Sequence, residues 1–182
     1  SKPKRTMSIT LKWGLITGMV YVIFSLVSNM LGLQQGGGSS AGLGILIYLL
    51  QWGGTFFTIY MRVKEIRDQE LGGYINVGLA FRKGMAIALI GGLISAVFTL
   101  IYMNFIDPDM GDRILEGAEE QWDAANIPEE QREMSRKFTG IFLNPWIMAP
   151  FVIVWVALGG MVKSLIAGSI LKNEAPPTVP MA

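Results

Sequence analysis

Lys163 is the residue whose position most suggests chemistry, because it interrupts a stretch of apolar residues that is otherwise free of charge. It precedes Lys172 by nine residues, which places it roughly 13 Å deeper along a helix. A charge inside a membrane segment is by default a functional hypothesis. The side chain could instead extend along the helix to the headgroups, pair with a polar group, or bind an anionic headgroup of a lipid or a partner. The residues alone leave these alternatives open.

The acidic run Asp107, Asp109 and Asp112 is the second candidate for chemistry. A calcium loop of the EF-hand type needs glycine at its sixth position and glutamate at its twelfth. Counted from Asp107, those positions hold Asp112 and Ala118, so the pattern fails. The chain has no cysteine and no histidine, which excludes cysteine and histidine metal sites and histidine acid–base chemistry. We therefore expect no metal, no cofactor and no enzymatic activity.

The composition is that of a membrane protein. Hydrophobic residues make up 51% of the chain and charged residues only 16%, against about 25% charged in ordinary soluble domains. The net charge of +1 gives no reason to expect binding to nucleic acid.

Four long apolar segments organise the chain. Each reaches the roughly 20 residues that a helix needs to cross a bilayer, and the first is too long for a cleaved signal peptide. We therefore predict an all-α membrane protein, a bundle of four transmembrane helices forming a single domain over residues 1–182. The predicted spans are 11–33, 41–61, 85–106 and 147–171.

Charges on the connecting segments predict how the chain is threaded. The N-terminal tail, the connection after the second span and the C-terminal tail carry most of the basic residues outside the spans, whereas Gln34–Ser40 has no charge and 107–144 is strongly acidic. Cytoplasmic segments collect Lys and Arg. Both termini are therefore predicted to be cytoplasmic and 107–144 to lie outside.

Small and polar residues at helical spacing predict where the helices touch. Lipid tails are as apolar as leucine, so close backbone contact and polar contacts must hold membrane helices together. Asn29 and Gln51 are expected to form hydrogen bonds between helices. The candidate packing residues are Gly14, Gly18, Asn29, Gln51, Gly84, Ala88, Gly92, Ala96, Gly160, Ser164 and Gly168.

Both long connections are predicted to contain structure. On the cytoplasmic side, Arg67, Asp68 and Glu70 form either a contact site for a partner or lipid, or a solvated turn with local ion pairs. A short helix at the membrane interface is expected over 74–83. In the outer 3–4 loop, 107–144, we expect two short amphipathic helices, the first capped by Asp107.

Two stretches resemble a known family: Arg67-Asp-Gln-Glu-Leu-Gly-Gly-Tyr-Ile-Asn-Val-Gly-Leu-Ala-Phe and Tyr102-Met-Asn-Phe-Ile-Asp-Pro-Asp109. Together with the hydrophobic layout and the end of the fourth span, they make the chain similar, from Leu11 to Lys172, to a family of small four-helix membrane proteins, mostly from Bacteroidota and known only as a domain of unknown function. The resemblance implies a bacterial cytoplasmic (inner) membrane and brings no catalytic residues with it.

Two functional hypotheses follow. The first is a non-catalytic accessory or scaffold subunit that associates, within the lipid bilayer, with another integral membrane protein. The second is a small transporter or channel, working as a homo-oligomer, in which Lys163, Gln51 and Asn29 line the path. A transporter would need chains to pair, because four helices scarcely enclose a pathway.

Overall fold

The computed structural model describes residues 2–33 and 41–174, and nearly all of them are helical. Within these ranges the only strand-like feature is an isolated antiparallel bridge between Ile75 and Asn173. The predicted all-α class is therefore confirmed. The elements are α1 (Lys2–Met30), α2 (Ala41–Gln69), α3 (Val77–Ile101), the π-helical turn η2 (Tyr102–Ile106), α4 (Met110–Ala124), α5 (Glu129–Phe142) and α6 (Pro145–Leu171).

Four of these helices, α1, α2, α3 and α6, are long and apolar enough to cross a membrane. The chain is thus a multi-pass membrane protein. The helices extend beyond the predicted spans: α2 continues to Gln69, and α3 begins at Val77, where Asn76 accepts a hydrogen bond from the Leu79 amide. Residues 77–83 are therefore the first turns of α3 and not a separate interfacial helix. The predicted connection Gln34–Ser40 lies outside the described residues.

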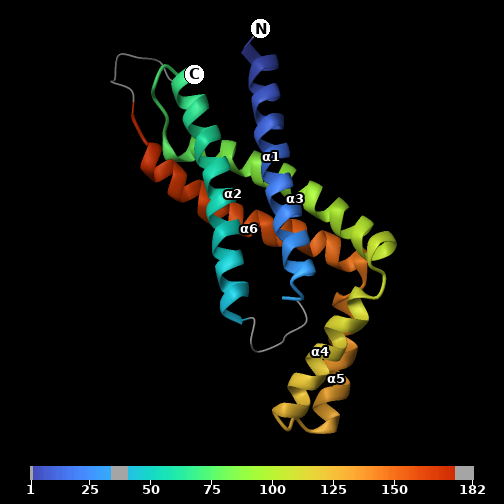
Figure 1. Ribbon diagram of the computed structural model, residues 1–182. Coiled ribbons are helices and arrows are strands. Elements are labelled where there is room, and N and C mark those ends of the chain that lie inside the picture. The colour runs from blue at the N-terminus through green and yellow to red at the C-terminus, as the bar shows by residue number, and fades with distance from the viewer. Residues whose placement is uncertain (1, 34–40, 175–182) are drawn as a thin grey trace.

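An antiparallel pair, α3 and α6, forms the most extensive contact in the bundle, and α1 and α2 cross in front of this pair (Figure 1). Residues with small side chains make the pair possible: Ala80 lies against Gly168, Gly84 against Ser164, and Ala88 against Gly160. The register advances by four residues on each helix, as expected when the same face of each helix is used at every turn. We call this line of small residues in contact the α3–α6 seam. It gives the close backbone approach that holds membrane helices together.

The turn between α2 and α3 is tied to the end of α6. Gly72 and Gly73 adopt positive φ angles of 64° and 92°, which glycine takes without steric cost. Ile75 and Asn173 exchange backbone hydrogen bonds of 2.8 and 2.9 Å, and the Asn173 side chain donates to the Gly73 carbonyl. This cluster joins residues that are about a hundred positions apart, and it closes one end of the bundle.

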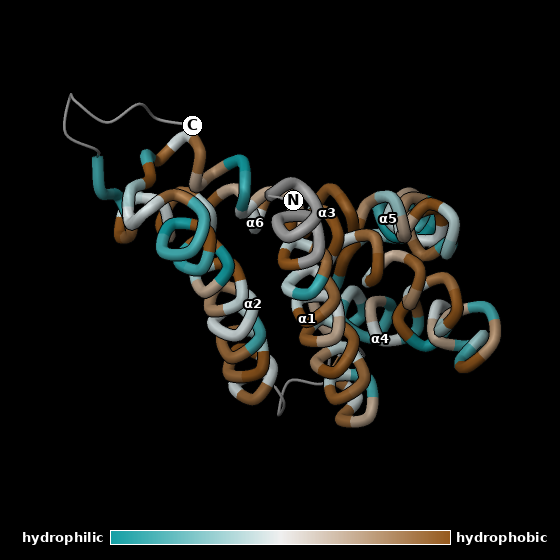
Figure 2. Tube along the Cα trace, turned by 90° about the horizontal axis from the view of Figure 1, so that it is seen from above, coloured by the Kyte–Doolittle hydropathy of each residue, from teal (hydrophilic) through white to brown (hydrophobic). Residues whose placement is uncertain are grey.

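A helical hairpin of α4 and α5 extends from the other end (Figure 1). Ion pairs of Arg132 with Asp123 and of Arg136 with Glu119 link its two helices. The expected capping differs in detail, because α4 begins at Met110 and Asp107 instead pairs with Arg113. Hydrophilic residues concentrate on this hairpin and at one end of α2, whereas hydrophobic residues cover the long helices (Figure 2).

Candidate functional site

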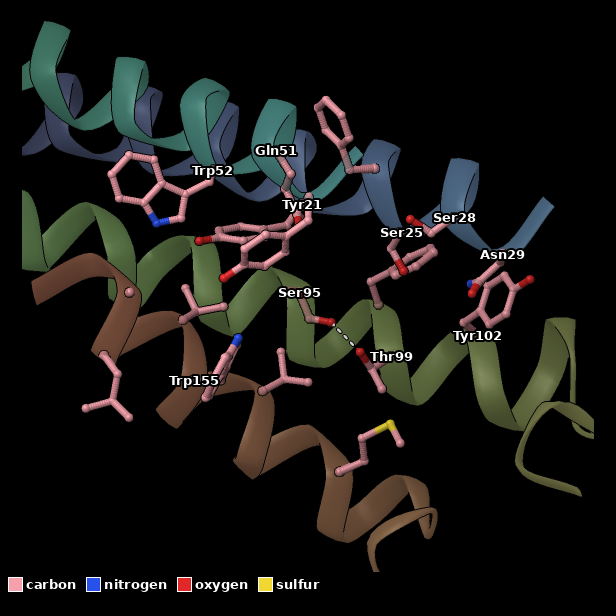
Figure 3. A pocket seen from close by; sticks show the side chains of 18 of the residues that line it. Tyr21, Ser25, Ser28, Asn29, Gln51, Trp52, Ser95, Thr99, Tyr102 and Trp155 are labelled. Carbon is pink, nitrogen blue, oxygen red and sulfur yellow. Dashed lines mark hydrogen bonds between the residues drawn. The ribbon is translucent and has the colours of Figure 1, made fainter. Parts of the chain in front are cut away.

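A cavity of about 570 Å³ lies among α1, α2, α3 and α6. This volume is in the range of pockets that hold drug-sized molecules. Side chains from all four helices point into it (Figure 3). The lining residues that carry polar groups are Tyr21, Ser25, Ser28, Asn29, Tyr48, Gln51, Trp52, Ser95, Thr99, Tyr102, Trp155 and Lys163.

The polar lining arises from two helical stripes that face each other. On α1, Tyr21, Ser25 and Ser28 follow one another at intervals of four and three residues, and on α3 Ser95 and Thr99 are four residues apart. Such spacing puts residues on one side of a helix. The Thr99 hydroxyl donates to the Ser95 carbonyl at 2.9 Å (Figure 3), a local bond that satisfies a hydroxyl inside an apolar segment.

Lys163 lies inside the bundle, with only 3% of the residue exposed. Its Nζ donates to the Thr55 hydroxyl at 2.7 Å and to the Tyr21 hydroxyl at 3.3 Å. The same nitrogen lies 5.7 Å from the centroid of the Tyr21 ring and 5.5 Å from that of Trp52. Of the sequence-based alternatives, the structure therefore shows pairing with polar and aromatic groups, since the side chain does not extend to the end of the helix.

Threonine hydroxyls hold this lysine in place. Thr55 accepts from Lys163 while its own hydroxyl reaches the Gln51 carbonyl at 2.9 Å. One turn further along α2, the Thr58 hydroxyl lies 2.8 Å from that of Thr17 on α1 and donates to the Thr55 carbonyl. Because Thr17, Thr55 and Thr58 are all buried, this network fixes α1, α2 and α6 relative to one another around the lysine.

Asn29 and Gln51 both lie in the cavity wall. The Asn29 Nδ2 is buried and has no hydrogen-bond partner among residues 2–33 and 41–174, so the predicted interhelical bond is absent for its amide nitrogen. The main-chain carbonyl of Gln51 accepts a hydrogen bond from the Thr55 hydroxyl. The two residues and Lys163, which the sequence separates widely, are thus brought to one cavity.

The glycines named from the sequence lie at helix contacts. A Cβ at Gly14 would come within 2.5 Å of Ile90, and one at Gly18 within 2.6 Å of Ile94, so α3 isoleucines fill the space that these α1 glycines leave. Gly92 lies against Val156. The Ala96 side chain is buried as well.

The charged residues Arg67 and Asp68 at the end of α2 and Glu70 in the following turn do not line the cavity. The Arg67 guanidinium lies 2.7 Å from Asp68 and donates to the Leu171 carbonyl at 3.4 Å. Glu70 lies 3.8 Å from the buried Arg62. These contacts join the end of α2 to the end of α6 and pair charged residues within α2 and the turn that follows it.

No group of three or more Asp or Glu residues that could hold a metal ion occurs in the part of the chain that the structure describes. What the site offers is a cation, several hydroxyls, an unbonded amide nitrogen and aromatic rings. Such groups can bind and orient a molecule, and they provide no carboxylate base beside the lysine.

Sequence reasoning missed Thr55, Trp52 and Tyr21, the immediate neighbours of Lys163. Thr55 is a single hydroxyl in an apolar segment, and nothing local marks it as facing a lysine on another helix. The two facing stripes did leave a signal, because Tyr21, Ser25 and Ser28 recur at helical spacing, as do Ser95, Thr99 and Tyr102.

Comparison with known proteins places the chain in a family. No curated protein matched it, and no solved structure matched it. The family match expected from the two sequence stretches is confirmed over residues 12–173, from just inside α1 to the residue that pairs with Ile75. The chain belongs to the family described as Protein of unknown function (DUF4199).

Proposed function

We propose that this membrane protein binds a small molecule in the cavity among its four long helices and acts as a small transporter without catalytic activity. The observation that carries the proposal is that Lys163, Gln51 and Asn29, from three different helices, all line one cavity. Polar and ionisable groups inside membrane segments are costly and mark the pathways of substrates and ions. A bundle that served only as a scaffold would have no need of such a cavity.

The proposal includes pairing of two chains. One copy lines the cavity with four helices, and transporters commonly form their binding sites between repeated halves. A second copy would supply the missing half of a pathway.

The accessory-subunit hypothesis stays a prediction. It differs from transport in its expected purification behaviour: a stoichiometric larger membrane protein would accompany the chain in gentle detergent. A homodimer without such a companion favours the transporter.

For the orientation, we propose that both termini face the cytoplasm of a bacterial cell and that the membrane is the inner one. The basic flanks support this orientation. A single cysteine in place of Gly37 should react with an impermeant thiol reagent from the outside only. Labelling from the cytoplasmic side alone would reverse the orientation.

Ser95→Phe tests the binding proposal, because Ser95 lines the cavity and a phenyl group would fill part of it. Ser169→Phe is the matched control, since Ser169 is exposed on α6 and does not line the cavity. Native mass spectrometry of the purified chain should find a bound small molecule in the unaltered protein and in Ser169→Phe, and none in Ser95→Phe. Equal retention in both variants, or no bound molecule in any sample, would overturn the proposal.

A further inference from the structure

We propose that the molecule bound in the cavity is an anionic amphiphile, whose carboxylate or phosphate head lies against Lys163 and whose apolar body lies along the aromatic wall. This inference rests on the proposed function and adds the chemical class of the ligand.

The charge of the cavity is the first argument. Among its described lining residues Lys163 is the one that carries a charge, so the wall is positive. No carboxylate of residues 2–33 or 41–174 lies within 4.0 Å of its Nζ. A buried charge without a counterion is costly, and an anion in the cavity would remove that cost.

The immediate partners of Lys163 are the second argument. An ammonium group has three N–H donors, and the hydroxyls of Thr55 and Tyr21 accept two of them. The rings of Tyr21 and Trp52 favour a cation nearby but bring no negative charge. These contacts keep the lysine in position and leave one N–H for a ligand.

The remaining wall is the third argument. The unbonded Nδ2 of Asn29 lies eight residues along α1 from Tyr21, so it adds a donor at the end of the cavity away from the lysine (Figure 3). Phe24, Phe98, Met148 and Trp155 provide the apolar part of the lining. A molecule with an anionic head and an apolar body matches this division, whereas a fully hydrated inorganic anion would leave the apolar wall unused.

Three probes with the same body separate the possibilities: 11-bromoundecanoate, 11-bromoundecyl phosphate and the neutral 11-bromoundecanol. The bromine quenches tryptophan fluorescence, and Trp52 and Trp155 lie in the cavity wall. The full chain is measured in phosphatidylcholine nanodiscs. Ser95→Phe, in which a phenyl group occupies part of the cavity, measures the quenching that comes from partition into the lipid.

We expect both anionic probes to quench the unaltered chain saturably beyond this background. Lys163→Met should weaken them at least roughly tenfold and leave the alcohol unchanged, because it removes one partner of a buried charged pair. Lys163→Arg should keep binding within a few fold. Lys172→Met is the matched control, because Lys172 follows the last residue of the same helix and 51% of its side chain is exposed. This substitution should have no effect on binding. Tighter binding of the phosphate than of the carboxylate, or the reverse, identifies the head group.

Equal affinity for alcohol and anion, or unchanged anion binding in Lys163→Met, would overturn the anionic class while leaving the cavity as a binding site. Quenching by no probe beyond the Ser95→Phe background would also overturn it, and the proposed function would still be decided separately by mass spectrometry. If Lys163→Met fails to fold, the comparison of anion and alcohol on the unaltered chain decides.

Discussion

The two halves of the α3–α6 pair are built differently. From Ala80 to Ala88, α3 presents small residues to Gly160, Ser164 and Gly168, and the two backbones come close. Beyond Gly92 the residues between the two helices are different. There α3 carries Ser95 and Thr99, α6 carries valines and Trp155, and a cavity opens toward α1 and α2.

This difference separates stability from function within one bundle. In a membrane, close contact of small residues holds helices together, and the seam of small residues provides that contact. The cavity half gives up contact and places polar groups where they are costly. Substitutions of the small residues in close contact should therefore act on stability, and substitutions of residues that line the cavity, Lys163 included, should act on binding.

The largest expected effect is in the seam. A Cβ at Gly160 would lie 2.3 Å from the Ala88 Cβ, so Gly160→Ala should destabilise the fold by about 2 kcal/mol, since two backbones must move apart. Gly53→Ala is the control, because nothing lies within 4 Å of its added Cβ. It should be neutral or stabilising by up to about 1 kcal/mol. Equilibrium unfolding in mixed micelles measures the unfolding free energy of both variants. Equal effects would contradict the claim that close contact in the seam stabilises the bundle.

An intermediate effect is expected beside the lysine. Thr55→Val removes an acceptor from the buried Lys163 ammonium and should cost about 1.5 kcal/mol of unfolding free energy. In a Lys163→Met background the same change should cost much less, because the donor is gone. Thr99→Val is the control, because the Thr99 hydroxyl donates to the Ser95 carbonyl of its own helix. A cost that is additive in the double variant would mean that the two residues do not interact.

The smallest effect is expected near the cytoplasmic end predicted for α1. The Trp13 indole donates to Glu65 on α2, and hydrogen bonds between membrane helices contribute about 0.6 kcal/mol on average. Trp13→Phe should lower the unfolding free energy by about that amount. Trp146→Phe, at a residue that is 70% exposed, should not. A loss of several kcal/mol in Trp13→Phe would contradict the prediction that this residue contributes a single interhelical hydrogen bond.

Sequence reasoning reached the helical class, the four long helices and the family, because apolar length and composition are properties of single segments. It also named Gly84, Ala88 and Gly160, since spacing by four marks one face of a helix. It did not reach the cavity. Lys163, Thr55 and Tyr21 come from three helices, and their meeting depends on how those helices pack, which no single segment encodes. The sequence also did not show that α3 begins at Val77. The charges of Arg82 and Lys83 suggested a separate short helix at the membrane interface, whereas Asn76 caps one helix that runs through both residues.

The most direct measurement compares two single-cysteine variants of α1, in a chain that has no cysteine of its own. Ser25 lines the cavity, whereas Ile23, two residues earlier, is 53% exposed on the outer surface of the bundle. In lipid vesicles, Ser25→Cys should react with a small anionic thiosulfonate reagent, more slowly when Lys163 is replaced by Met, and Ile23→Cys should stay unreactive in the lipid. Equal reactivity of the two cysteines, or an inert Ser25→Cys, would contradict a polar, cationic cavity inside the membrane domain.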